Sequence, residues 1–271
     1  MRILPLDCPA EQLSAGDLIH VETPVNPYGT AVSISELAAK AHPRGAYLMV
    51  DSTFAPPPLQ DPFSLGADVV MHSCTKYIGG HSDLLGGLLA IRHDYDNTPN
   101  NGAEIAHKLR TERLLLGAVM GSLEGWLGLR SIRTLSLRIT KASNNATKLV
   151  EWLHSLSSSS ASPISKVHHA SLQISSDATS SSWLPKQMTN GYGPVFALTM
   201  RTAKMARHLP SKLALFHHAT SLGGVESLIE WRALSDASAD ERLLRVSVGC
   251  EDWEDLKKDL EKALKEVEGL E

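Results

Sequence analysis

The chain has 271 residues, more than a usual single domain, so we expect one large domain or two unequal domains that share an interface. Its net charge of -4, with 21% charged residues, argues against a general affinity for nucleic acid or an anionic membrane. The three cysteines lie far apart without C-x-x-C spacing, which argues against a disulfide framework and a zinc site. With neither a signal-peptide pattern at its start nor a stretch of roughly 20 apolar residues, the sequence predicts a cytoplasmic protein.

Strand and helix patterns alternate in the first half of the chain. Apolar strands are predicted at residues 17–24, 45–53, 67–73 and 86–92, with a helix at 33–45 between the first two strands. Strands joined by helical or irregular crossovers form a mostly parallel sheet that is buried on both faces. The sequence therefore predicts an α/β fold with helices on both faces of the sheet.

Three polar side chains lie near the carboxyl ends of these strands. They are Asn26, Asp51 and Lys76, and each lies at or closely after the end of a different predicted strand. Ligands bind at the carboxyl ends of strands in sheets of this kind. We therefore expect the three side chains to meet at one edge of the sheet.

Beyond the sheet, residues 103–155 carry a long helical periodicity with room for at least two helices. Serine-rich tracts follow at 155–162 and 175–182. Their composition cannot bury enough apolar surface to become ordered, so we expect a domain boundary near the first tract and a flexible insertion at the second.

The end of the chain returns to regular structure. Strands are predicted at 193–200 and 243–249, and an amphipathic helix with acidic residues in its first turn at 251–270. The sequence is thus divided into a large domain, 1–155, and a smaller C-terminal α/β domain, 156–271, which carries the serine-rich insertion.

Lys76 follows an apolar strand and precedes a glycine pair. Position alone favours a surface lysine at a strand end, whereas a Schiff-base lysine must be held near an aldehyde cofactor and kept partly unprotonated. Ser73 and Thr75 supply hydroxyls suited to a phosphate, and Asp51 is suited to keep a pyridine nitrogen protonated. Pyridoxal phosphate needs this set of groups.

Other motifs carry less chemistry. The glycine-rich stretch 79–87 fits neither a P-loop nor the dinucleotide fingerprint. The pairs His168-His169 and His217-His218 lack the i, i+4 spacing of a helical zinc site, and we expect no metal.

Four segments carry a family resemblance. In chain order, ETPVNP, VDSTFAPPPLQDPFSLGADVVMHSCTKYIGGHSDLLGG, SLGGVESL and LLRVSVGCED resemble the Cys/Met-metabolism, or trans-sulfuration, family of pyridoxal-phosphate-dependent enzymes, cystathionine γ-synthases in particular. The resemblance runs over essentially the whole chain. It implies the aspartate-aminotransferase-like fold (fold type I), with pyridoxal 5′-phosphate held by the large domain.

The resemblance also implies a role for each matching residue. Lys76 would form the internal aldimine and shuttle protons between substrate carbons, Asp51 would pair with the pyridinium nitrogen, and Asn26 would contact the ring hydroxyl. The phosphate would be bound by Ser73 and Thr75, the substrate side of the lysine lined by Ser221 and Leu222, and the substrate α-carboxylate clamped by Arg245. Each residue alone has an ordinary explanation as a cap, turn or surface charge; their order and spacing together favour the site.

Family members begin with a long segment that has no counterpart here and that completes the neighbouring subunit's site. We therefore expect a truncated cofactor-binding domain, from either a fragment or a short form with weak cofactor affinity. Family members form tetramers, so the resemblance implies a homo-oligomer, although the segment that makes much of the family's subunit interface has no counterpart here.

The sequence predicts γ-replacement on an O-acyl-homoserine, a small amino-acid substrate, through Lys76. Cystathionine β-lyase or γ-lyase cleavage of a C–S bond, and a non-catalytic truncated relative, are the alternatives left open. Thr220 and the segment 230–236 depart from the family pattern, which leaves the sulfur substrate undecided.

Overall fold

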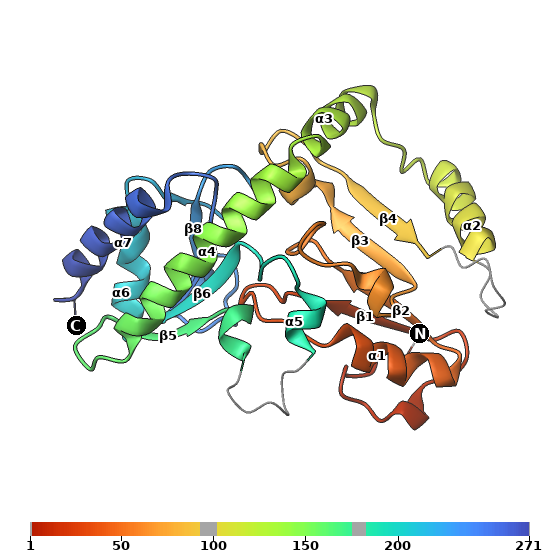
Figure 1. Ribbon diagram of the computed structural model, residues 1–271, viewed down its shortest axis with the longest axis horizontal. Helices are drawn as coiled ribbons and strands as arrows, with labels where there is room; N and C mark the ends of the chain where they lie inside the picture. Colours follow the sequence, from red (N-terminus) through yellow and green to blue (C-terminus); the bar gives the residue numbers. More distant parts are fainter. Residues whose placement is uncertain (1, 93–101, 175–182, 271) are drawn as a thin grey trace.

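The computed structural model describes residues 2–92, 102–174 and 183–270, which form two sheets with helices packed around them (Figure 1). The insertion predicted at 175–182 lies outside the described residues. In chain order the elements are β1 (Leu18–Glu22), α1 (Ile34–Ala41), β2 (Tyr47–Asp51), β3 (Val69–Ser73), β4 (Gly87–Ile91), α2 (Gly102–Leu115), α3 (Ser122–Ile132), α4 (Leu135–Ser157), β5 (Ile164–His168), α5 (Leu184–Gln187), β6 (Val195–Met200), α6 (Ala203–His208), β7 (His217–His218), β8 (Leu228–Trp231), β9 (Leu243–Ser247) and α7 (Trp253–Val267).

The first sheet has the strand order β1-β2-β3-β4. β1, β2 and β3 run parallel, whereas β4 returns antiparallel to β3. Leu48 and Val50 of β2 are fully buried in the core that α1 covers. Ser33 begins α1 by accepting a hydrogen bond from the Glu36 N–H at 3.3 Å. The predicted α/β fold is confirmed, with a mostly parallel sheet and helices on both sides.

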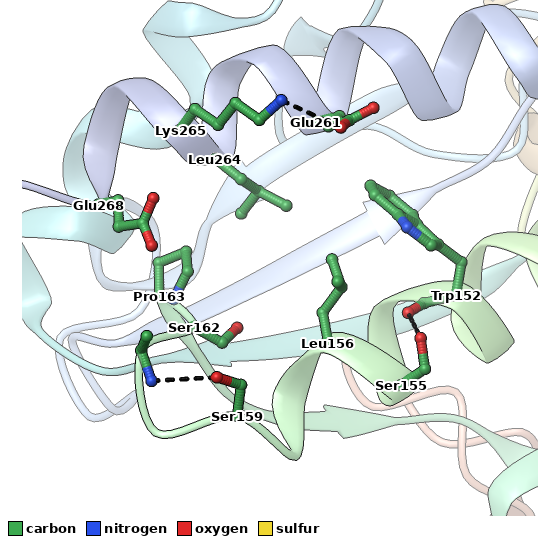
Figure 2. A pocket seen from close by; sticks show the side chains of 11 residues that line it. Trp152, Ser155, Leu156, Ser159, Ser162, Pro163, Glu261, Leu264, Lys265 and Glu268 are labelled. Carbon is green, nitrogen blue, oxygen red and sulfur yellow. Dashed lines mark hydrogen bonds and ion pairs between the residues drawn. The ribbon is translucent and has the colours of Figure 1, made fainter.

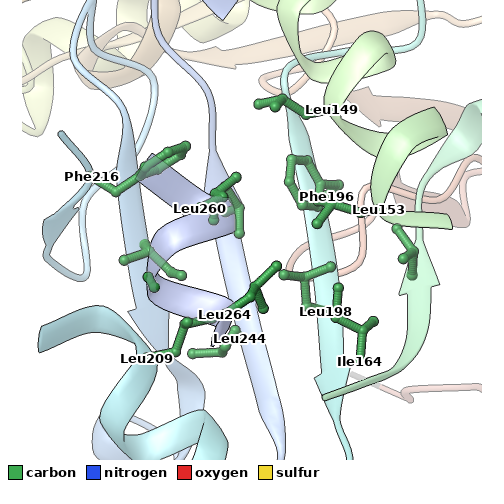
Figure 3. Packing of buried hydrophobic residues seen from close by; sticks show 14 of the residues in the cluster. Leu149, Leu153, Ile164, Phe196, Leu198, Leu209, Phe216, Leu244, Leu260 and Leu264 are labelled. Carbon is green, nitrogen blue, oxygen red and sulfur yellow. The ribbon is translucent and has the colours of Figure 1, made fainter. Parts of the chain in front are cut away.

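The second sheet has the order β5-β6-β9-β8-β7 and is antiparallel except between β7 and β8. Its apolar side chains pack with α4, α6 and α7 in one core. Figure 3 shows Phe196 and Leu244 of the sheet beside Leu260 and Leu264 of α7. Burying each such side chain stabilises the fold by about 1.5–3 kcal/mol.

α4 belongs to both halves of the molecule. Near its start, Leu135 and Ile139 pack in the core around the segment after β3, while Leu149 and Leu153 pack in the core of the second sheet. A domain boundary at 155 would fall in the last turn of this helix, and that division stays a prediction.

The serine-rich tract at 155–162 is ordered, contrary to the prediction. α4 continues through Ser157, and Ser162 is buried. Arg201 donates to the backbone oxygens of Ser159, at 2.7 Å, and of Ser162. Hydrogen bonds from a residue distant in sequence therefore order a tract that has few apolar side chains of its own.

Within the described part of the chain, no helix is both long and apolar enough to cross a membrane.

Candidate active site

The ends of β1 and β2 place two carboxylates next to each other. Glu22 and Asp51 are the last residues of their strands and are paired in the parallel register. The Asn26 N–H donates to Glu22 Oε2 at 3.2 Å. Burial raises the pKa of Glu22, and the charge of Asp51 adds to this effect, while the Asn26 bond and Arg245 oppose it.

Thr53 connects Asp51 to the end of β3. Its N–H donates to Asp51 Oδ1 at 2.9 Å, and its hydroxyl accepts a hydrogen bond from the Ser73 N–H at 2.9 Å. The half-buried Asp51 and Ser73 are therefore held at neighbouring strand ends.

Lys76 lies in a single π-helical turn, Cys74–Ile78, directly after β3. Its φ of -93° and ψ of -125° are not helical, and isolated π-turns are frequent at functional sites. The Thr75 hydroxyl accepts a hydrogen bond from the Gly86 N–H at 3.3 Å, which ties the turn to the start of β4.

Arg138 of α4 fixes the far end of this turn. It donates to the backbone oxygens of Tyr77, at 2.8 Å, and Ile78, at 3.4 Å. The lysine turn is thus attached to the helix that both halves of the molecule share.

The loop after β7 lies against Lys76. A Cβ on Gly223 would lie 2.9 Å from Lys76 Cα, and Gly223 has a φ of 86°, so both the contact and the backbone conformation require glycine. The Gly223 N–H donates to Ser247 Oγ at 3.1 Å, and Leu222 is buried in the same core as Tyr77.

The amine of Lys76 has an altered proton affinity. Burial lowers the pKa of Lys76, as does the charge of Arg245, while Glu230 opposes them. A lowered pKa leaves more of the amine in the unprotonated form that a nucleophilic or basic lysine requires.

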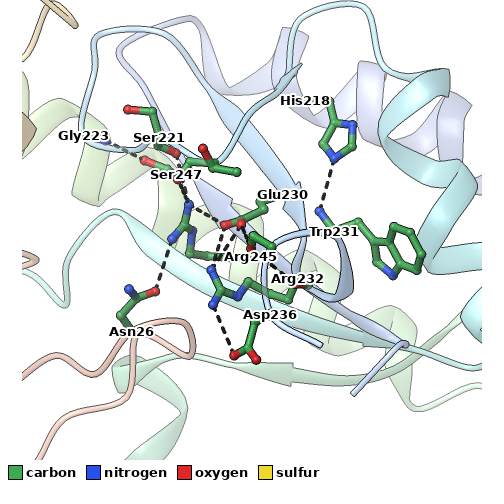
Figure 4. A network of polar contacts seen from close by, with 12 residues as sticks. Asn26, His218, Ser221, Gly223, Glu230, Trp231, Arg232, Asp236, Arg245 and Ser247 are labelled. Atoms are coloured by element: carbon green, nitrogen blue, oxygen red, sulfur yellow. Dashed lines mark hydrogen bonds and ion pairs between the residues drawn. The ribbon is translucent and has the colours of Figure 1, made fainter. Parts of the chain in front are cut away.

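Arg245 lies in the middle of β9 with only 4% of its surface exposed (Figure 4). Its Nη2 donates to the backbone oxygens of Thr220, at 2.6 Å, and Ser221, at 3.2 Å, and its Nη1 donates to Asn26 Oδ1 at 3.3 Å. Arg245 therefore links the second sheet to the turn after β1.

Glu230 of β8 is the counter-charge of Arg245. Its Oε2 lies 2.6 Å from Arg245 Nη2, and the Glu230 side chain is only 1% exposed. Arg232 Nη1 donates to both Glu230 oxygens, at 3.2 and 3.1 Å, and the Ser235 hydroxyl donates to Oε1. Burial lowers the pKa of Arg245, and Glu230 opposes this effect.

The structure joins most of the predicted site residues through direct contacts or one intervening residue. Asn26, Ser221 and Arg245 form one hydrogen-bonded network, and Lys76 lies against the loop that contains Leu222. Asp51 and Ser73 are joined through Thr53, and Thr75 is bonded within its own loop.

The sequence predictions do not assign a role in the site to several residues of these networks, among them Glu22, Thr53, Glu230 and Arg232. Glu22 immediately precedes the turn that contains Asn26, and Thr53 follows Asp51 by two positions. Glu230 is an acid in the short apolar strand LIEW, and a charge placed there needs a partner.

The histidine pairs have ordinary surroundings. His169 is buried with Nε2 3.1 Å from the Gly193 oxygen and Nδ1 2.8 Å from Ser171 Oγ, and both residues of the pair His217-His218 are exposed. Among the residues that the structure describes, no three His, Cys, Asp or Glu side chains are grouped to hold a metal ion.

A separate cavity of about 340 Å³ lies between α4 and α7 (Figure 2). Its lining includes the apolar side chains of Trp152, Leu156 and Leu264, together with the 3.1 Å ion pair Lys265–Glu261. None of the predicted site residues lines it.

The chemistry of the site suits pyridoxal phosphate. A lysine with a lowered pKa is available for the aldehyde, a strand-end carboxylate for the ring nitrogen, and hydroxyls beside the lysine for the phosphate. The residues that would hold the cofactor are Asn26, Asp51, Ser73, Thr75 and Lys76.

Comparison with known proteins supports this chemistry. The family described as Cys/Met metabolism PLP-dependent enzyme matches residues 10–265. A cystathionine gamma-synthase from Mycobacterium tuberculosis is 40% identical over 258 residues, covering 91% of this chain and 61% of that protein. A cystathionine beta-lyase from Lactococcus lactis is 35% identical over 257 residues, covering 91% of this chain and 63% of that protein.

Two solved structures are similar in fold. The metB structure from Corynebacterium glutamicum has a TM-score of 0.81 and 34% identity, covering 93% of this chain and 63% of that chain. CalE6, a methionine gamma lyase from Micromonospora echinospora, has a TM-score of 0.79 and 38% identity, covering 92% of this chain and 63% of that chain. The chain therefore spans less than two thirds of these relatives, and it belongs to the Cys/Met-metabolism family of enzymes, whose cofactor is pyridoxal 5′-phosphate.

Proposed function

We propose that the chain performs pyridoxal-phosphate-dependent γ-replacement on an O-acyl-homoserine. The close contact between the Lys76 turn and Gly223, in a loop that Arg245 also holds, supports lysine-based cofactor chemistry. The 40% identity to the Mycobacterium tuberculosis cystathionine gamma-synthase is what favours γ-replacement. When bound, the cofactor supplies an electron sink for negative charge at the substrate α-carbon. The remaining work falls to the side chains of the chain itself.

Lys76 Nζ would remove the α-proton and return it at a later carbon, a role for which its lowered pKa is suited. Asp51, oriented by the Thr53 N–H, would keep the ring nitrogen protonated and so stabilise the negative charge electrostatically. Asn26 would contact the ring hydroxyl, and Ser73 and Thr75 would bind the phosphate.

Arg245 would bind the substrate α-carboxylate, because its planar guanidinium suits a carboxylate and is held by fixed acceptors. Ser221 and Leu222 would line the substrate side of the lysine. Binding of the carboxylate at Arg245 would orient the α-carbon toward Lys76.

Cleavage of the carbon–sulfur bond of cystathionine is the second candidate, because the Lactococcus lactis relative carries the name cystathionine beta-lyase. A product assay separates the reactions. Formation of cystathionine and a free carboxylate from cysteine and an O-acyl-homoserine supports γ-replacement, and release of homocysteine, pyruvate and ammonia from cystathionine and water supports β-cleavage.

The first test is cofactor attachment. The chain would be incubated with pyridoxal phosphate, reduced with borohydride and mapped by mass spectrometry, with Lys76→Ala as the control. Label on Lys76, together with turnover that the variant lacks, is the expected result. Label spread over surface lysines, or turnover that survives Lys76→Ala, would contradict the proposal. Attachment at Lys76 without any turnover would favour a non-catalytic relative.

A further inference from the structure

We infer that Arg232 is a positioning residue for Arg245: by sharing the buried carboxylate of Glu230, it leaves positive charge at Arg245 available for a substrate α-carboxylate. The inference rests on the proposed function, in which Arg245 binds that carboxylate. Arg232 itself acts through Glu230 and is assigned no contact with the substrate.

The contacts of Arg245 restrict where a ligand can bind to it. Nη2 has two hydrogens but meets three acceptors, namely Glu230 Oε2 and the backbone oxygens of Thr220 and Ser221. Nη2 is therefore fully used in holding the side chain in place. A carboxylate would bind at the Nη1 side, which also donates to Asn26 Oδ1 at 3.3 Å.

Glu230 alone would weaken such binding. One carboxylate 2.6 Å from one guanidinium forms a neutral pair, so an incoming carboxylate would be repelled by Glu230 as well as attracted by Arg245. The Glu230 side chain is 1% exposed, so water screens this repulsion little.

Arg232 restores the missing charge. Its Nη1 contacts both oxygens of Glu230, so two guanidiniums share one carboxylate and an excess positive charge remains. Asp236 lies 3.7 Å from Arg232 Nη2 and is 43% exposed, against 17% for Arg232, so water screens Asp236 more strongly. The buried group formed by Arg232, Glu230 and Arg245 therefore carries a net positive charge.

Arg232 can be replaced without breaking the ion pair between Glu230 and Arg245. Glu230 would keep its contacts with Arg245 and Ser235, so no buried charge would lose its last partner. Arg232 Nε is also buried without a hydrogen-bond partner within the described structure, so replacing Arg232 by leucine removes an unsatisfied buried donor.

The test uses the chain loaded with pyridoxal phosphate and two probes, L-alanine, which has an α-carboxylate, and L-alaninamide, which does not. Their dissociation constants are measured from the change in cofactor absorbance, for wild type, Arg232→Leu, Arg232→Gln and Arg232→Lys. Arg242→Leu is the matched control, because it removes an arginine whose ion pair with Asp240 is about half exposed.

We expect Arg232→Leu and Arg232→Gln to weaken L-alanine binding about tenfold, because each removes one positive charge from the group around Arg245. Binding of L-alaninamide, which has no carboxylate, should be unchanged. Arg232→Lys should recover most of the loss, and Arg242→Leu should behave as wild type. Borohydride labelling of Lys76 in each variant shows that the cofactor site is intact. If Arg232→Leu does not fold, Arg232→Gln provides the same test.

Equal weakening of both probes would show a merely structural role and overturn the inference, and so would unchanged L-alanine binding in variants with intact Lys76 labelling. In both of these cases the proposed function would stand. Absence of Lys76 labelling in the wild type would instead overturn the proposed function, and this inference with it.

Discussion

His169 shows how a single buried side chain makes the stability of this protein depend on pH. Burial lowers the pKa of His169 to about 4, although the Gly193 oxygen opposes the shift. The imidazole is therefore neutral at pH 7. In the unfolded chain it would be protonated at an ordinary pKa of about 6.5.

Acid should therefore destabilise the fold through this residue. Between pH 7 and pH 5 the unfolded state binds the proton and the folded state does not, so His169 should lower the free energy of unfolding by about 2 kcal/mol. Urea denaturation at the two pH values measures this change. In His169→Gln the decrease in the free energy of unfolding between pH 7 and pH 5 should be about 2 kcal/mol smaller than in the wild type. His154→Gln, at an exposed position of α4, should show the same decrease as the wild type. An unchanged drop in His169→Gln would contradict the prediction.

The Glu230–Arg245 pair makes a second prediction for single residues. Glu230→Leu should lower the free energy of unfolding by about 3 kcal/mol, because a buried guanidinium loses its carboxylate. Arg245→Leu in the same chain should recover part of this loss, so the double variant should be more stable than the sum of the two single variants implies. Urea denaturation of the wild type, the two single variants and the double variant completes this double-mutant cycle. If the two single effects on the free energy of unfolding simply add in the double variant, Glu230 and Arg245 are not coupled.

At the scale of elements, the π-helical turn that carries Lys76 is held between α4 and the loop that contains Gly223. Gly223→Ala should push this loop away from Lys76, lowering the free energy of unfolding by about 2 kcal/mol. It should also reduce borohydride labelling of Lys76 several-fold. Gly16→Ala is the matched control, because Gly16 has the same φ of 86° but its added Cβ would meet nothing within 4 Å. Equal loss of Lys76 labelling in Gly223→Ala and Gly16→Ala would show that backbone strain alone causes the loss, and would contradict a role for the contact between Gly223 and Lys76.

The elements that the sequence predicts are those with a strong local pattern. β2 and β6 are apolar runs bounded by glycine or proline, and α7 has a regular apolar stripe with Asp252 as its N-cap. β8 was missed because its four residues include a buried glutamate, and β7 because it has two residues. Such short strands are fixed by their neighbours in the sheet and leave little pattern in the sequence.

The same limit applies to the site. Lys76, Asp51 and Asn26 could be predicted because each lies at or shortly after the end of a strand with a clear apolar pattern. Arg232 and Glu230 come together with Arg245 only through the pairing of β8 with β9, which places Glu230 opposite Arg245. That register depends on the tertiary fold, so the carboxylate shared by two arginines could not be predicted from spacing.

At the scale of the whole molecule, α4 makes the two halves depend on each other for stability. Ile139→Ala and Leu153→Ala remove buried side chains from different cores, and each should lower the free energy of unfolding by about 3 kcal/mol. Because both residues belong to one helix, both variants should shift a single transition that circular dichroism and tryptophan fluorescence report alike. Leu137→Ala, at a position of α4 that is 74% exposed, should change little. Two separate transitions would show that the halves unfold independently.

The shared helix also limits how the molecule can open. α4 runs unbroken through 23 residues from one core to the other, so the two sheets cannot rotate apart as rigid bodies without bending this helix or separating packed side chains. The loop against Lys76 is held by its own hydrogen bonds, from Arg245 to the Thr220 and Ser221 oxygens, from the Gly223 N–H to Ser247 Oγ and from the Val225 N–H to the Gly80 oxygen at 3.0 Å, and none of these involves α4. Access to the lysine would therefore be governed by local displacement of this loop, and hinge-like closure of two domains would play little part.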